Sequence, residues 1–158
     1  MPVIEERYPS PSVHLDSPKL ARLEALMPAA VTPLRPLFLA LVPRTILSEA
    51  SFEYWYRTRG EAVGMHIDEY VKRYSPEECY AAAQPALAQI TALLQETEGP
   101  YFLGETVSYA DFVWGAYLAF CKTLGDNYFH QVVKTAGGEE AHLALFRGIE
   151  KWTERNNY

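Results

Sequence analysis

The sequence predicts an all-α domain of six or seven helices. Serine followed by proline, a strong helix-start signal, occurs at Ser17-Pro18 and at Ser75-Pro76. Apolar residues recur at spacings of three and four along most of the chain, and no segment shows sustained period-two alternation. The chain has 158 residues, which suits one domain with its own hydrophobic core.

The first twelve residues are expected to stand apart from this domain. Residues 2–8 have the composition of the last turns of a helix, and Pro9-Ser-Pro-Ser12 ends it. We therefore assign residues 1–12 to the remnant of a preceding helix with an interdomain linker, and residues 13–158 to the helical domain. A chain that opens within a helix is typical of a piece of a longer protein.

The next two helices are rich in helix-breaking residues. One is expected from Pro18 to near Val42, kinked or broken by the prolines at positions 28, 33, 36 and 43. Ser48 or Ser51 is expected to cap the other, an aromatic helix that extends toward Tyr74. Glycines at positions 60 and 64 weaken this helix locally.

Clear start and stop signals mark the third helix. Ser75 is a cap, proline follows at the first helical position, and Glu77 and Glu78 lie near the positive end of the helix dipole. The pattern predicts that this helix runs to Gly99-Pro100.

The segment from Tyr101 to Phe112 is the most informative stretch of the chain. Ser108 is placed as an N-cap with Asp111 three residues later, which is the spacing of a capping box. The helix that follows, from Tyr109 to about Lys122, is apolar on nearly every face, so we expect it at the centre of the domain. We assign Ser108 and Asp111 to this structural cap rather than to a polar active site.

Two further helices complete the prediction. Residues 125–127 mark a break, and a short helix is expected over residues 128–134. Gly137-Gly138 predicts a turn. A last helix is expected from about Glu139 to Arg155, with apolar residues at spacings of three.

Composition excludes several functional classes. The net charge is −6 and no Lys/Arg cluster is present, so nucleic acid is not expected as a partner. No apolar run is judged to approach the roughly 20 residues of a membrane span, and the N-terminus lacks the pattern of a secretory signal. The two cysteines form no metal or disulfide framework, which favours a cytoplasmic location.

Three segments resemble the C-terminal domain of glutathione transferases. They are Phe102-Leu-Gly104 followed by Ser108…Asp111, the stretch Tyr54-Trp-Tyr-Arg-Thr-Arg-Gly-Glu61 with Gly64, and residues 3–11. The second segment is similar to fungal and etherase-like members. The resemblance implies an orthogonal helical bundle built around the 109–122 helix.

In that family, the glutathione site and the thiol-activating Ser, Cys or Tyr belong to a thioredoxin-like domain that precedes this one. The resemblance therefore implies no catalytic residue, metal or cofactor in this chain, with glutathione as co-substrate of the intact protein. It implies a hydrophobic small molecule as ligand, the thioredoxin-like domain as partner, and a possible homodimer. The intact protein would conjugate glutathione or cleave ethers, whereas this chain alone is expected not to turn over. The alternative is a stand-alone ligand-binding or protein-interaction module.

The candidate ligand-binding residues are Tyr54, Arg57 and Tyr117. An aromatic helix with Arg57 and Arg59 could bind an anionic ligand or the missing domain, or these could be surface charges that pair with nearby acids such as Glu61. Tyr54 and Tyr117 could line a hydrophobic pocket, although most aromatic residues of helical bundles belong to the core.

Cysteine and histidine offer little chemistry in this sequence. Cys121 is expected to be an inert residue of the central helix. Cys79 lies in a first helical turn, where the dipole lowers a thiol pKa, but its acidic neighbours oppose that effect. The four histidines are scattered, with no metal-ligand spacing.

Overall fold

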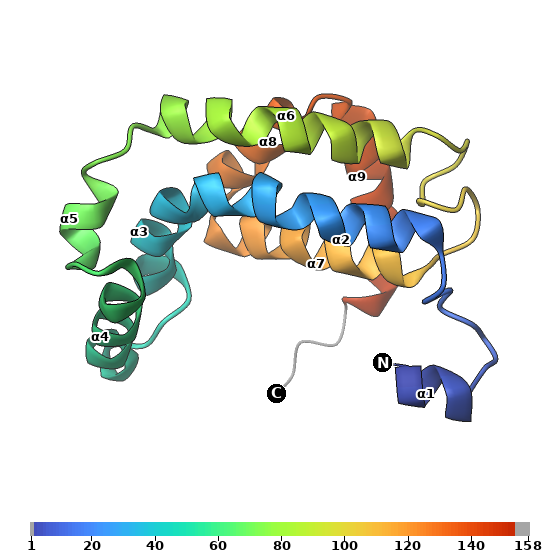
Figure 1. Ribbon diagram of the computed structural model, residues 1–158, viewed down its shortest axis with the longest axis horizontal. Helices are drawn as coiled ribbons and strands as arrows, with labels where there is room; N and C mark the ends of the chain where they lie inside the picture. Colours follow the sequence, from blue (N-terminus) through green and yellow to red (C-terminus); the bar gives the residue numbers. More distant parts are fainter. Residues whose placement is uncertain (1, 154–158) are drawn as a thin grey trace.

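The computed structural model describes residues 2–153, and over these residues the fold is all-helical (Figure 1). The central helix is α7 (Tyr109–Leu124), which packs against α2 (Pro18–Val31), α3 (Arg35–Thr45), α8 (Asp126–Ala136) and α9 (Glu139–Gly148). Helix α6 (Pro76–Leu94) packs on α2 and α8 across the body. The predicted fold class and the central place of the 109–122 helix are both confirmed.

Three further helices lie at the two ends of the molecule. Helix α1 (Pro2–Arg7) stands at one end, beside the start of α2, while α4 (Phe52–Val63) and α5 (Ile67–Val71) form the other end (Figure 1). Short 3-10 turns cover Thr32–Leu34, Glu49–Ser51 and Glu150–Trp152. The described part therefore holds more helices than the six or seven predicted, because several predicted helices are split.

The proline-rich stretch splits around Pro33 and Pro36, whereas Pro28 and Pro43 lie inside α2 and α3 without ending them. Helix α2 ends at Val31, the 3-10 turn Thr32–Leu34 follows directly, and α3 starts at Arg35 with Pro36 in its first turn. Pro33 and Pro36 lack backbone N–H groups, so the regular i to i−4 ladder cannot pass through them. The chain still continues in nearly one direction, with a bend visible between α2 and α3 (Figure 1).

This same stretch corrects one sequence-based expectation. The sequence was expected to contain no apolar run near the length of a membrane span. By length and composition, however, Pro18–Thr45 is long and apolar enough to cross a membrane. Core helices of globular proteins pass the same test. Leu20, Leu23 and Leu34 are buried against the rest of the domain, whereas only 28% of the apolar window is buried, so the stretch packs on the core along one face.

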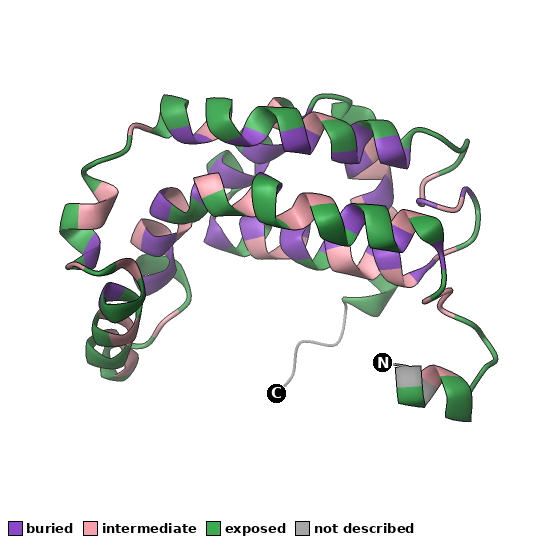
Figure 2. Cartoon of the chain, in the orientation of Figure 1, coloured by how far each residue is buried: buried purple, intermediate pink, exposed green. Residues whose placement is uncertain are grey.

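The aromatic helix is shorter than predicted. Helix α4 ends at Val63 because Gly64 adopts φ 74°, a left-handed conformation that terminates a helix. The next residues form the separate short helix α5 rather than one helix toward Tyr74. In α4 only Gly60 is buried, and most of its surface faces solvent (Figure 2).

Other boundaries shift by a few residues. Helix α6 begins at Pro76 with a complete Ser75–Glu78 capping box but ends at Leu94, before the predicted Gly99-Pro100. Helix α8 starts at Asp126, two residues early. Helix α9 ends at Gly148, and a 3-10 turn follows; the predicted end at Arg155 lies outside the described residues.

The core lies where the inner faces of α2, α6, α7, α8 and α9 meet (Figure 2). Trp114 and Phe102 are the largest of its completely buried side chains. Phe102 comes from the loop before α7, where two isolated β-bridges between residues 101 and 106 form a tight turn. This loop is therefore part of the core rather than a surface connection.

Candidate functional site

A cavity of small-molecule size lies between α3, α5, α6 and the junction of α7 with α8. Its volume is about 670 Å³, within the roughly 300–1,000 Å³ of small-molecule sites. Most of its lining is apolar or aromatic. The lining residues are Leu37, Ala40, Leu41, Val71, Tyr74, Pro76, Glu77, Tyr80, Leu124, Gly125, Asn127, Tyr128 and Gln131.

The helix-breaking residues of the sequence shape this cavity. Gly125, at φ 131°, ends α7 and lets α8 begin immediately in a new direction. That turn presents Asn127 and Tyr128 to the cavity. On the facing side, Pro76 opens α6 and places Tyr80 one turn further along the same helix.

Tyrosines gather at the inner side of the cavity. Tyr128 is 5% exposed, and Tyr117 on α7 is 8% exposed. Burial is the main cause of the raised pKa of both, and the neighbouring Cys121 thiol raises both further. Burial also raises the pKa of Tyr80 to about 12. These phenols are therefore neutral donors at physiological pH, not bases.

Two of these hydroxyls lack a protein partner. The Oη atoms of Tyr117 and Tyr128 are buried, and neither has a hydrogen-bond partner among the described residues. The two phenols lie close enough for each to affect the other's pKa, but not within hydrogen-bonding geometry. A buried hydroxyl without a partner costs about 1–3 kcal/mol.

Glu77 is the one charged side chain in the cavity lining over the described residues. A negative group at the mouth, in a chain of net charge −6, disfavours anionic ligands. The arrangement can hold a neutral, largely apolar molecule and can donate hydrogen bonds to it. It offers no activated nucleophile.

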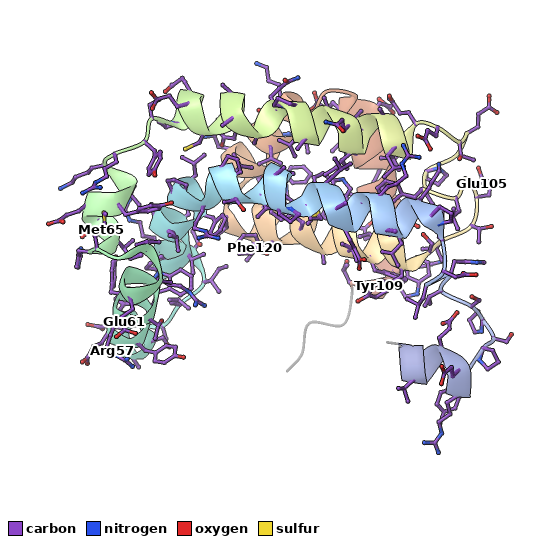
Figure 3. The ribbon with its side chains drawn as sticks, viewed as in Figure 1. Arg57, Glu61, Met65, Glu105, Tyr109 and Phe120 are labelled. Atoms are coloured by element: carbon purple, nitrogen blue, oxygen red, sulfur yellow. The ribbon has the colours of Figure 1, made fainter. Side chains whose placement is uncertain are left out.

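Tyr54 and Arg57, two of the three predicted ligand-binding residues, lie together on α4 but outside this cavity. Tyr54 is 65% exposed, and the Arg57 guanidinium lies 5.7 Å from its ring centre. Arg57 also pairs with Glu61 at 3.6 Å, on the outer part of α4 (Figure 3). This geometry matches the surface-charge alternative for Arg57.

Tyr117, the third predicted residue, lies apart from that pair. Its ring packs against Trp114, with 5.4 Å between ring centres, and against Phe120 at 6.5 Å. It is a core residue behind the cavity rather than part of its lining. The sequence analysis missed Tyr80 and Tyr128; the only signal was their position beside the breaks at Ser75-Pro76 and Gly125.

A second, smaller cavity of about 340 Å³ lies between α3 and α4. Phe38 and Trp55 line it together with Arg35 and Arg59, and the Arg59 guanidinium lies 5.0 Å from the Trp55 ring centre. Arg59, like Arg57, therefore lies against an aromatic ring of α4, but Arg59 does so in the lining of a cavity.

Ser108 is the N-cap of α7, and Asp111 is its third helical residue. The Asp111 carboxylate is completely buried and accepts hydrogen bonds from Phe102 N at 2.8 Å, Ser108 N at 2.7 Å and Ser108 Oγ at 2.7 Å. Burial raises the Asp111 pKa, and these donors oppose the rise. The carboxylate ties the preceding loop to the helix start and faces no cavity described here.

A buried polar network that the sequence analysis missed joins three helices. His142 on α9 contacts Trp114 Nε1 through Nδ1 at 3.0 Å and Thr91 Oγ1 through Nε2 at 2.8 Å. Because indole N–H can only donate, Nδ1 must be the acceptor and Nε2 carries the proton. Burial lowers the His142 pKa to about 4. A neutral imidazole fully occupied in this way is structural.

Neither cysteine is poised for thiol chemistry. Cys79 and Cys121 are both free and buried. Burial raises the pKa of both thiols, for Cys121 to about 12, and Glu78 adds to the rise at Cys79. The part of the chain that the structure describes contains no cluster of three or more potential metal-ligating side chains.

Comparison with known protein families identifies the family of this chain. The family model described as glutathione S-transferase, C-terminal domain, matches residues 21–146, which is more than half of the chain. No curated protein and no solved structure matches significantly. The matched range spans α2 through most of α9, including the capped central helix and the walls of the larger cavity. The chain therefore belongs to the family of glutathione S-transferase C-terminal domains.

Proposed function

We propose that this domain binds a hydrophobic small molecule in the 670 Å³ cavity between α3, α5, α6 and α8. The observation that carries the proposal is the apolar lining, contributed by Leu37, Leu41 and Leu124 together with tyrosine rings. In the intact protein, this ligand would be the acceptor for glutathione conjugation or the substrate of ether cleavage, with glutathione as co-substrate.

Catalysis by this chain alone is not part of the proposal. Thiol activation needs a donor or a positive dipole that favours the thiolate, whereas burial raises the pKa of Cys79, Cys121 and the cavity tyrosines. We infer that a thioredoxin-like domain supplies that chemistry as a partner in full-length relatives. The two free thiols also support our proposal of a cytoplasmic location.

A thermal-shift titration with a planar hydrocarbon, 2-isopropenylnaphthalene, and separately with glutathione tests the proposal. Because a ligand that binds only the folded state raises the melting temperature, we expect the hydrocarbon to raise it and glutathione to leave it unchanged. An increase with glutathione would indicate a thiol-peptide site within this chain and would contradict the proposal.

A matched pair of variants locates the site. Ala40 lines the cavity, whereas Ala92 is exposed on α6 outside it. Ala40→Phe should fill part of the cavity and abolish the hydrocarbon-induced shift, while Ala92→Phe should preserve it. An equal shift in both variants would place hydrocarbon binding elsewhere.

The exposed α4 supports a second candidate, a protein-interaction module that could form a homodimer. This helix packs mainly against α5 and the 3-10 turn before it, and Tyr54 is 65% exposed on it. Large exposed aromatic residues are typical of interfaces. Light scattering during size-exclusion chromatography tests this candidate: a monomer up to high concentration would contradict self-association, and Tyr54→Ala should dissociate a dimer built on α4.

A further inference from the structure

We propose that the smaller cavity between α3 and α4 is a second binding site, which takes a flat aromatic molecule with one carboxylate group. Arg35 and Arg59 pair with the carboxylate, and Phe38 and Trp55 contact the aromatic ring. The inference goes beyond the proposed function, because it concerns a different cavity and a charged ligand.

Two helix faces build this cavity, and each supplies one arginine and one aromatic ring. Arg35 and Phe38 lie three positions apart on α3, and Trp55 and Arg59 lie four positions apart on α4. Residues at these spacings share one face of a helix. Helix α4 packs mainly against α5 and the 3-10 turn before it, so the two faces leave about 340 Å³ between them, within the range of small-molecule sites.

The charge of this cavity is opposite to that of the larger one. Its charged lining residues are the two arginines, whereas Glu77 lines the larger cavity. Neither Arg35 nor Arg59 forms an ion pair within the part of the chain that the structure describes. The net charge of the chain is −6, so two neighbouring cations without acidic partners form a local positive site that favours an anion.

Both arginines are accessible to a ligand. Arg35 and Arg59 are exposed although they line the cavity, so an anion can meet them without opening the core. A guanidinium group presents paired N–H donors that match the two oxygens of a carboxylate. Because the carboxylate stays at the exposed mouth, it keeps part of its hydration and avoids the full cost of burying a charge.

The walls of the cavity favour an aromatic body on the ligand. Phe38 and Trp55 are half-buried, and Leu39 between the two arginine-bearing faces is 3% exposed. The Arg59 guanidinium lies 5.0 Å from the Trp55 ring centre, which keeps the cation beside the aromatic wall. Trp55 acts through its ring, because its Nε1 is closed to solvent and therefore to a ligand. A flat ring against these walls buries apolar surface while its carboxylate meets Arg59.

Isothermal titration calorimetry with three probes tests the inference. The probes are 2-naphthoate, the neutral molecule 2-acetylnaphthalene of the same shape, and acetate, which has the carboxylate without the ring. Each is titrated into the natural chain and into Ala40→Phe, in which the larger cavity is filled. We expect 2-naphthoate to bind both chains equally, and to bind Ala40→Phe more tightly than either other probe does. Added salt should weaken 2-naphthoate binding, because it screens the charges.

Three arginine variants locate the carboxylate. Arg35→Gln and Arg59→Gln should each weaken 2-naphthoate binding about tenfold, the lower end of the range for a hydrogen bond to a charged group. Arg57→Gln removes the same charge from α4 outside the cavity, where Arg57 pairs with Glu61 (Figure 3), and should leave the affinity nearly unchanged. All three residues are exposed, so the melting temperatures should stay close to that of the natural chain and show that the variants are folded.

The outcomes separate this inference from the proposed function. Loss of 2-naphthoate binding in Ala40→Phe would place the anion in the larger cavity and overturn the inference. An equal loss of affinity in Arg57→Gln and Arg59→Gln would show that net charge alone attracts the anion, and would overturn it as well. So would equal affinities of 2-naphthoate and 2-acetylnaphthalene for Ala40→Phe. The proposed function fails instead when 2-isopropenylnaphthalene does not bind the natural chain, whatever 2-naphthoate does.

Discussion

Trp114 Nε1 donates a 3.0 Å hydrogen bond to Nδ1 of His142, which joins the central helix α7 to α9 inside the core. Both side chains are completely buried. Thr91 completes the network, because it contacts His142 Nε2 at 2.8 Å and lies 2.9 Å from the Ala136 carbonyl. One neutral imidazole thus links α6, α7 and α9 and the end of α8.

This network predicts a pH dependence of stability. The His142 pKa falls from 6.5 to about 4 on folding, so between these values the unfolded chain binds a proton that the folded chain does not. Stability is therefore lost as pH falls through this window, by about 2 kcal/mol between pH 7 and pH 5. Urea unfolding at several pH values measures this slope. His142→Gln, compared over the same range, should show a smaller slope; equal slopes would contradict the assignment.

Asp111 is predicted to be a structural carboxylate. In Asp111→Ala, the buried N–H groups of Phe102 and Ser108 lose their acceptor, and the unpaired groups should cost about 3 kcal/mol. Asp111→Asn keeps one acceptor oxygen and should cost less. Denaturant unfolding measures both. A loss of ligand binding in Asp111→Asn without a loss of stability would instead indicate a role in a site.

The unpaired hydroxyl of Tyr117 gives a prediction of the opposite sign. Because it has no partner, Tyr117→Phe removes an unpaired buried group and should leave the melting temperature unchanged or raise it. Tyr101→Phe removes the 2.9 Å bond to Gly148 O and should cost about 1 kcal/mol. Calorimetric unfolding compares them. A marked destabilisation by Tyr117→Phe would show that this hydroxyl has a partner.

Two glycines at positive φ are predicted to differ in tolerance. Gly99 has φ 121°, and a Cβ there would lie 2.5 Å from the Gly104 carbonyl carbon. Backbone atoms cannot yield cheaply, so Gly99→Ala should cost about 3 kcal/mol. Gly64 has φ 74° but no atom within 4 Å of an added Cβ, so Gly64→Ala should cost only about 1 kcal/mol of backbone strain. Thermal unfolding of both variants checks the order.

Local signals accounted for most of the helical architecture. Ser75-Pro76 begins α6, Ser108 with Asp111 begins α7, and Gly137-Gly138 separates α8 from α9, because caps, prolines and glycines act within one helical turn. The errors lie where two local signals compete. The helical spacing of residues predicted one aromatic helix toward Tyr74. The left-handed φ of Gly64 instead ends that helix at Val63.

The residues of the candidate site could be predicted much less well from the sequence than the helices. Tyr54 and Arg57 were chosen from an aromatic and basic pattern, yet the structure places them on the exposed face of α4. Tyr128 carries no distinguishing motif, and it reaches the cavity only because α8 turns at Gly125 and packs against α6. Long-range packing of this kind leaves no periodic trace in the sequence.

The sequence by itself determined the helical class, the buried central helix and the family resemblance, since these depend on residue spacing and local caps. Only the tertiary structure decided which polar groups find partners. The same burial that leaves the Tyr128 hydroxyl unpaired gives His142 two neighbours, Trp114 and Thr91. The difference arises because hydrogen-bond partners come from helices distant in sequence, and their positions are fixed only when those helices pack.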